Sequence, residues 1–225
     1  MFAAVTAGSS GNEMAGRDAA AFLRWARSDL GAAAVTQLTI HNDPATAPTL
    51  LTHDLPLIIE ELAARGITLE RWPARAALPE GADQAVILAA YAEEIARVQE
   101  GGRYATVDAI RMTPEHPERE ALRQRFLAEH THSEDEVRFF VEGRGLFCLH
   151  IGEEVLQLIC ERNDWIAVPA GTRHWFDMGA APRFCALRFF DETAGWVAAF
   201  TGDPIADRYP RLDDPALTAV AAGTD

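Results

Sequence analysis

Apolar and polar residues alternate in short runs along much of this 225-residue chain. Residues 36–41 (TQLTIH) alternate with a period of two, which is typical of a strand with one buried face. Segments 137–152, 154–161, 164–171 and 183–191 are rich in β-branched and aromatic residues, and Gly, Pro, Asn or Asp separate them. Repeated short strands with turn signals predict an antiparallel barrel or sandwich.

Helical spacing interrupts this pattern in three places. Segment 55–66 begins with Pro56 in its first turn and ends at Gly66, both common helix-end signals. Segments 84–99 and 117–130 also carry apolar residues at helical intervals. We therefore expect a mainly β fold with attached helices. The remaining expected elements are strands at 67–72 and 104–112 and a short helix at 195–202.

The composition changes near residue 35. Residues 1–35 are rich in Ala, Gly and Ser, and predict an N-terminal extension that is disordered or loosely attached. Residues 36–215 form the predicted folded domain, and 216–225 a flexible tail.

The chain carries 34 acidic and 20 basic residues, a formal net charge of −14. Such a surface repels nucleic acid and anionic membranes, because binding either requires clustered Lys and Arg. Cys148, Cys160 and Cys185 lie in apolar runs without metal-binding spacing, which predicts buried, reduced thiols. The N-terminus lacks the pattern of a secretion signal and no apolar run is long enough to span a membrane. We expect a cytoplasmic monomer.

The segment HTHSEDE places candidate metal ligands at two-residue intervals. Side chains alternate faces in an extended chain, so His130 and His132 point the same way, and Glu136 has the same parity. His174, in VPAGTRHW, follows after a spacing that suits a later strand opposite the first. Imidazoles with one carboxylate suit iron(II), nickel, manganese or zinc, and four protein ligands leave two octahedral positions for a chelating substrate. A single histidine is more often a surface or hydrogen-bonded residue, but the combination predicts a mononuclear site.

Two motifs, H-x-H-x-x-x-E with Gly143 and P-x-G-x-x-H at residues 169–174, resemble those of the cupins. Longer strings at residues 120–152, 161–179 and 200–212 resemble the bacterial acireductone dioxygenases of methionine salvage. The resemblance extends from about Thr36 to Leu212 and implies a cupin-type antiparallel β-barrel, or jelly roll.

The resemblance also implies a reaction. Members cleave the acireductone 1,2-dihydroxy-3-keto-5-methylthiopentene with dioxygen. The iron(II) form gives formate and 4-methylthio-2-oxobutanoate, whereas the nickel form gives 3-methylthiopropanoate, formate and carbon monoxide. One Fe²⁺ or Ni²⁺ per chain is expected on His130, His132, Glu136 and His174.

Further positions carry over from the family to the surroundings of this site. Arg138 is expected to stabilise the substrate dianion, although a surface ion pair is the alternative. Arg188 corresponds to a second pocket arginine. Glu129 and Asp135 flank the ligands and are expected to influence metal loading, or else to be solvated carboxylates. The aromatics expected to line the substrate cavity, or alternatively to pack in the core, are Phe126, Phe176 and Trp196.

Two other functions fit the residues less closely. A non-enzymatic cupin sensor or storage domain would keep the ligands, but would not need paired pocket arginines, and no DNA-binding pattern is evident. A cupin dioxygenase or isomerase acting on another enol or thiol is the second alternative.

Overall fold

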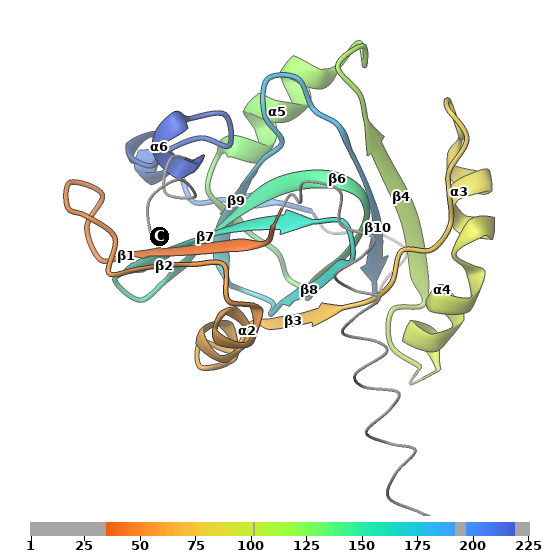
Figure 1. The fold of residues 1–225 in the computed structure, drawn as a ribbon, viewed down its shortest axis with the longest axis horizontal. Coiled ribbons are helices and arrows are strands. Elements are labelled where there is room, and N and C mark those ends of the chain that lie inside the picture. The colour runs from red at the N-terminus through yellow and green to blue at the C-terminus, as the bar shows by residue number, and fades with distance from the viewer. Residues whose placement is uncertain (1–34, 101, 192–196, 219–225) are drawn as a thin grey trace, which may run out of the picture. The chain divides into compact units, whose positions relative to one another are not determined.

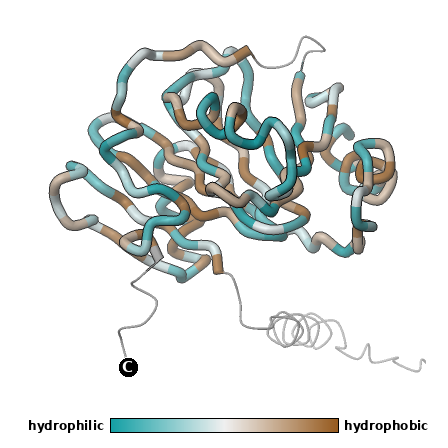
Figure 2. Tube along the Cα trace, turned by 90° about the horizontal axis from the view of Figure 1, so that it is seen from above, coloured by the Kyte–Doolittle hydropathy of each residue, from teal (hydrophilic) through white to brown (hydrophobic). Residues whose placement is uncertain are grey.

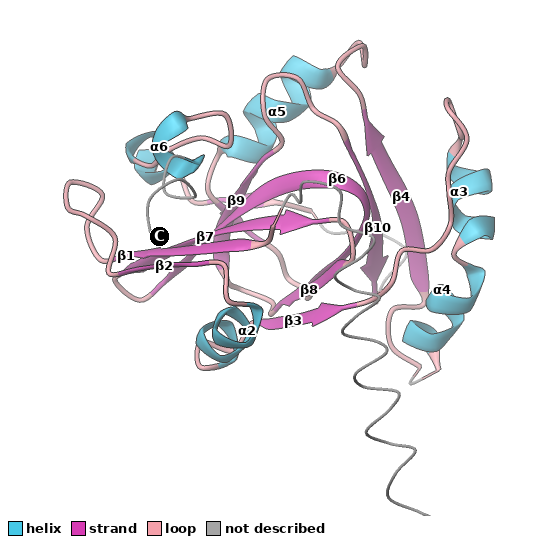
Figure 3. Ribbon diagram, viewed as in Figure 1, coloured by secondary structure: helices cyan, strands magenta, loops and turns pink. Residues whose placement is uncertain are grey.

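The computed structural model describes residues 35–100, 102–191 and 197–218. The N-terminal extension predicted for residues 1–35 lies almost entirely outside this part. Within it, strands predominate and short helices accompany them (Figures 1 and 3). The strands are β1 (Gln37–His41), β2 (Leu50–Thr52), β3 (Thr68–Arg71), β4 (Thr106–Met112), β5 (His130–Thr131), β6 (Glu136–Ile151), β7 (Glu154–Glu161), β8 (Asp164–Val168), β9 (Arg173–Asp177), β10 (Phe184–Phe190) and β11 (Ala199–Phe200). The helices are α2 (Leu55–Ala63), α3 (Gln84–Ala90), α4 (Ala92–Gln99), α5 (Arg119–Leu127), the 3₁₀ helix η1 (Pro204–Arg208) and α6 (Pro215–Thr218).

The strands pair antiparallel in two sheets that share the long strand β6. One sheet has the order β11-β5-β9-β6-β7-β1-β2. The other places β10 and β8 on either side of β6, with β4 and β3 as their outer neighbours. Two antiparallel sheets that enclose a common interior are the arrangement of a cupin-type jelly roll, which confirms the predicted fold class.

Strand β6 passes from one sheet to the other at Gly143. Its first part pairs with β8 and β10, and the part from Arg144 onward pairs with β7. Gly143 has φ +64°, and a Cβ atom there would lie 1.7 Å from the carbonyl oxygen of Arg183. Only glycine fits this conformation and this close approach, so Gly143 permits the passage.

Three apolar clusters explain why β6 is hydrophobic on both faces. Phe140 and Phe147 of β6 belong to the interior cluster between the sheets, to which α2 and α5 also contribute. Phe139 faces a second cluster, in which α3 and α4 cover the outer face of one sheet. Leu146 faces a third, in which η1 and α6 cover the other sheet. Hydrophobic and hydrophilic segments accordingly follow one another along the described trace (Figure 2).

Two expected helices were wrong in detail. The helix predicted over 84–99 is broken at Tyr91, whose φ of −119° and ψ of 25° are not helical. Tyr91 is buried against Phe139 and its hydroxyl donates to the carbonyl oxygen of Ala76, so tertiary packing overrides helix continuity. The third helix also ends at Leu127, before the expected residue 130.

The short helix predicted at 195–202 was also wrong where the structure describes it. Residues 199–200 are strand β11, which pairs with His130 and Thr131 of β5. Cross-strand pairing with a distant segment decides this conformation. Leu217, in the segment predicted as a flexible tail, is buried, and its carbonyl oxygen accepts from Gln37.

Other expectations are confirmed. The segment 55–66 forms α2, and Gly66 follows it with φ +79°. Cys148, Cys160 and Cys185 are all buried, free thiols. Among the described residues, no helix is long and apolar enough to cross a membrane.

Candidate metal centre

Three histidines converge inside the jelly roll. His130 in β5 is the direct cross-strand partner of His174 in β9, and His132 follows β5 at once. One ring nitrogen from each of the three lies within 4.8 Å of the others, and all three residues are buried. The prediction that His174 lies opposite the H-x-H strand is therefore confirmed.

Backbone carbonyl groups fix the orientation of the His130 and His174 rings. Nδ1 of His130 lies 2.7 Å from the carbonyl oxygen of Ala128, and Nδ1 of His174 lies 2.8 Å from that of Thr172. A carbonyl oxygen only accepts, so Nδ1 carries the proton and Nε2 presents a lone pair. Such outer contacts set the tautomer of metal-binding histidines.

Glu136, the first residue of β6, adds a carboxylate to this cluster. Its Oε2 lies 2.6 Å from Nε2 of His174 and 3.7 Å from Nε2 of His132. The lone pairs of Nε2 and of a carboxylate repel at such a distance unless a cation or a proton lies between them. Burial alone would raise the pKa of Glu136, but Arg138 and the histidines together hold it well below its usual value.

Burial favours the neutral form of the His130 and His132 imidazoles. Burial lowers the pKa of His132 to about 4, and burial together with His174 lowers the pKa of His130. Neutral imidazole and ionised carboxylate are the protonation states that bind metal. Three nitrogen donors and one oxygen donor suit a borderline divalent ion, so these residues fit one metal.

Arg138 lies beside the cluster on the same face of β6 as Glu136, as its parity predicted. It is only 3% exposed, and its Nη2 lies 2.5 Å from Oε1 of Glu136. Its guanidinium also lies over the rings of Phe147 and Phe176, at 5.1 and 4.7 Å from their centroids. The alternative of a surface ion pair is therefore wrong, because this pair is fully buried.

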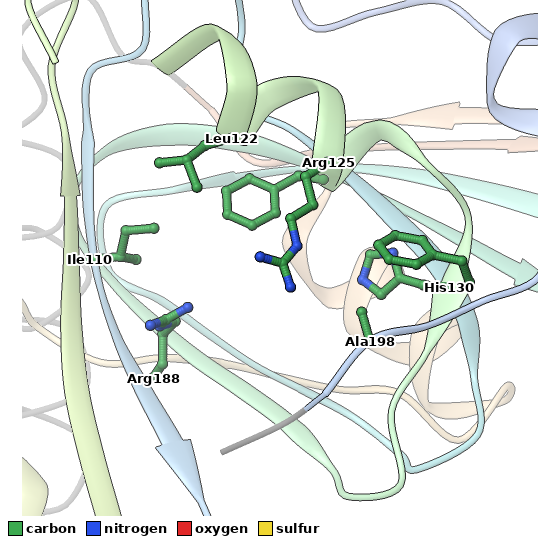
Figure 4. A pocket seen from close by; sticks show the side chains of 8 residues that line it. Ile110, Leu122, Arg125, His130, Arg188 and Ala198 are labelled. Carbon is green, nitrogen blue, oxygen red and sulfur yellow. The ribbon is translucent and has the colours of Figure 1, made fainter. Parts of the chain in front are cut away.

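A pocket of about 220 Å³ opens next to His130 (Figure 4). Phe126 and Arg188, two of the residues expected around the substrate, line this pocket together with residues that sequence reasoning had not selected. Arg188 is directly opposite Arg138 in the β10–β6 pairing and is held by two hydrogen bonds, of 2.7 and 2.5 Å, to Asp108. The additional lining residues are Ile110, Leu122, Arg125, Ala198 and Phe200.

The other predicted aromatics are placed differently. Phe176 is 1% exposed and packs in the interior cluster, where its ring contacts Phe126, Phe140, Phe147 and Phe184. It does not line the pocket beside His130, but it lies under the Arg138 guanidinium. Trp196 lies outside the described residues.

The two flanking carboxylates have distinct partners. Glu129 is buried and accepts from Thr201 Oγ1 at 2.6 Å, with His150 Nδ1 also at 2.6 Å. Glu129 directly precedes His130, so its hydrogen bond with Thr201 connects the start of β5 to the segment that follows β11. Asp135 is only partly buried, and it accepts from Arg103 and from the backbone N–H of Ala170.

Sequence reasoning missed Asp108, Arg125 and Phe200. Arg125 follows Leu122 by three residues and precedes Phe126, so helical periodicity could have placed it on the pocket face of α5. The ring of Phe200 lies 5.8 Å from that of His130, but only the β5–β11 pairing brings it there. The pairing of Asp108 with Arg188 likewise depends on strand register.

The fold and site together define a cupin-type protein with a buried cluster of three histidines and one glutamate. The profile of the ARD/ARD' family matches residues 37–198. Since this is well over half of the chain, the chain belongs to the ARD/ARD' family.

Individual relatives agree with that assignment. An acireductone dioxygenase of Prochlorococcus marinus (strain MIT 9303) is 65% identical over 184 residues, which cover 79% of this chain and 100% of the relative. One of Parasynechococcus marenigrum (strain WH8102) is 67% identical over 166 residues, or 74% of this chain and 89% of the relative. A solved acireductone dioxygenase from Bacillus anthracis, with a cadmium ion in its active center, has a TM-score of 0.66 and 29% identity. That match covers 75% of this chain and all of the solved one.

Proposed function

We propose that this chain is a metal-dependent dioxygenase that cleaves the acireductone 1,2-dihydroxy-3-keto-5-methylthiopentene with dioxygen, in methionine salvage. The observation that carries the proposal is the cluster of His130, His132, His174 and Glu136, next to a pocket that two arginines line. Family membership and the names of the relatives support the choice of substrate and reaction.

The four proposed ligands would hold one Fe²⁺ or Ni²⁺. A divalent ion at that position supplies a Lewis acid that can organise and polarise a chelating enediolate. The protein has the complementary tasks of orienting the ligands and of stabilising negative charge. The carbonyl oxygens of Ala128 and Thr172 keep the histidine rings in the required tautomer.

Arg138 is proposed to act through both charge and position. Its guanidinium compensates the buried carboxylate of Glu136 and remains charged beside the oxygens of a bound enediolate. Arg188, fixed by Asp108, is proposed to contribute a second positive charge from the pocket wall. Apolar residues of the same pocket, including Leu122 and Phe126, offer an environment suited to the methylthio end of the substrate.

The test is a spectroscopic assay. Acireductone is mixed anaerobically with protein loaded with iron or nickel, oxygen is then added, and the ultraviolet absorbance of the substrate is followed. Rapid loss compared with a metal-free control is expected. No loss with either metal would contradict the proposal and favour a sensor or storage cupin.

Analysis of the products shows which of the two cleavage reactions each metal supports. Iron-loaded protein is expected to yield formate and 4-methylthio-2-oxobutanoate, and nickel-loaded protein 3-methylthiopropanoate, formate and carbon monoxide. We further propose that the chain acts as a cytoplasmic monomer. Glu129 and Asp135 are proposed to influence metal loading, and Trp196 to contribute to the substrate cavity.

A further inference from the structure

Arg125 occupies a place in the pocket that neither the sequence motifs nor the proposed mechanism uses. It lies in the last turn of α5, its side chain is exposed, and its guanidinium points into the middle of the pocket (Figure 4). Arg188 and His130 line the same pocket. Two guanidinium groups that face one small cavity repel each other, and an anion between them relieves this repulsion.

The three arginines of this region differ in how their charge is compensated. Arg138 pairs with Glu136 and Arg188 pairs with Asp108. Arg125, by contrast, has no acidic partner within ion-pair distance among the residues that the structure describes. Its charge is therefore available to a ligand, and its exposed side chain can reach a ligand that has not yet entered fully.

The chain has a net charge of −14, which makes a positive side chain at the pocket important for binding an anion. An anionic substrate is repelled by the surface as a whole, so a local positive charge at the pocket is needed to attract it. Resting on the function proposed above, we infer that Arg125 is a substrate-recruiting residue, which attracts the enediolate and holds it in the pocket. Arg138 and Arg188, whose charges are already paired with carboxylates, would act later, on the seated substrate.

The experiment compares Arg125→Gln, Arg125→Lys and Arg119→Gln with the wild type. Arg119→Gln is the matched control, because it removes the same charge from an exposed position of the same helix that does not line the pocket. Three quantities are measured for each: metal per chain, the Kd for acireductone without oxygen, and kcat and KM at two salt concentrations. Thermal melting checks that each variant folds.

We expect Arg125→Gln to raise both Kd and KM about tenfold, as loss of one charge-assisted contact would. Its kcat and metal content should stay within about twofold of the wild type, since Arg125 is no ligand. The salt dependence of kcat/KM should become weaker. Arg125→Lys should recover most of the affinity, and Arg119→Gln should match the wild type.

The possible failures are distinguishable. If the wild type binds and turns over acireductone but Arg125→Gln and Arg119→Gln are indistinguishable in Kd and in kcat/KM, the recruiting role is wrong. A fall in kcat with unchanged Kd would also overturn it. Absence of binding and turnover in the folded, metal-loaded wild type would overturn the proposed function, and this inference with it.

Discussion

Two buried polar clusters in this molecule differ in whether the protein alone satisfies them. Asp164 is fully buried, and its carboxylate accepts hydrogen bonds from Thr36, Arg71 and the backbone N–H of Glu161, each at 2.7 Å. In the metal centre, by contrast, His174 Nε2 and Glu136 Oε2 approach to 2.6 Å while Nδ1 is already bound to a carbonyl. The first cluster is complete without a ligand, whereas the second fits an added cation. In this molecule, a buried polar cluster therefore indicates a ligand site where hydrogen-bond acceptors outnumber the protein donors that could pair with them.

Replacement of His174 should have the largest effect of the changes considered for the two clusters, and the effect should be on metal content and activity. In His174→Ala only three ligands remain, and we expect metal content well below one per chain. Activity should fall by more than the roughly 10- to 100-fold that outer contacts of metal ligands typically contribute. Atomic absorption and the oxygen-dependent assay measure both. The control is His116→Ala, which lies outside the cluster. A His174→Ala protein that retains one metal and normal turnover would show that the ligand set is wrong.

Replacement of Asp164 should affect stability instead. Asp164→Ala removes the acceptor of three hydrogen bonds and leaves the Glu161 N–H buried without it, so we expect a loss of about 2–4 kcal/mol in the free energy of unfolding. Urea denaturation measures this, and metal content should stay at one per chain. Asp207→Ala is the control, since its ion pair with Arg211 is exposed and should contribute less than about 1 kcal/mol. Loss of metal by folded Asp164→Ala protein would contradict the separation of the two clusters.

A smaller effect should depend on pH. Burial raises the pKa of Glu161, beside Asp164, from 4.5 to about 7. The folded state then binds a proton more tightly than the unfolded state, so the stabilising contribution is complete below pH 4.5 and is lost as the pH rises through about 7. We expect the wild type to lose about 1–3 kcal/mol relative to Glu161→Gln between pH 5 and pH 8. Denaturation of both proteins at several pH values gives the difference, in which the titration of groups distant from Glu161 cancels. A difference that does not change with pH would show that Glu161 is ionised throughout.

Part of the candidate metal centre could be predicted from the local sequence pattern. Parity placed His130 and His132 on one face, and its spacing placed His174 on a later strand; the β5–β9 pairing agrees with that placement. Glu136 reaches the histidines after a bend at residues 133–134. Side-chain alternation is a property of any extended chain, so it could be derived without knowledge of the fold. The strand-rich second half was predictable for the same reason.

Non-local contacts limited the other predictions. Nothing in the local sequence shows that Tyr91 leaves the helix to pack on Phe139, or that residues 199–200 join β5. Phe126 and Phe176 were equivalent as aromatics near the motifs, yet one lines the pocket and the other lies in the core. Each outcome depends on which distant surface a residue meets.

The sequence by itself determined the types of the proposed ligands, the common face of His130 and His132 and the mainly β fold, because residue chemistry and periodicity are local properties. Only the tertiary structure decided how charges are paired. Arg138 meets Glu136 within one strand, but Arg188 meets Asp108 through the β4–β10 register, and Arg125 faces the pocket through the packing of α5. The physical reason is that an ion pair forms only where two side chains end within a few ångströms, and sequence separation does not reveal that distance.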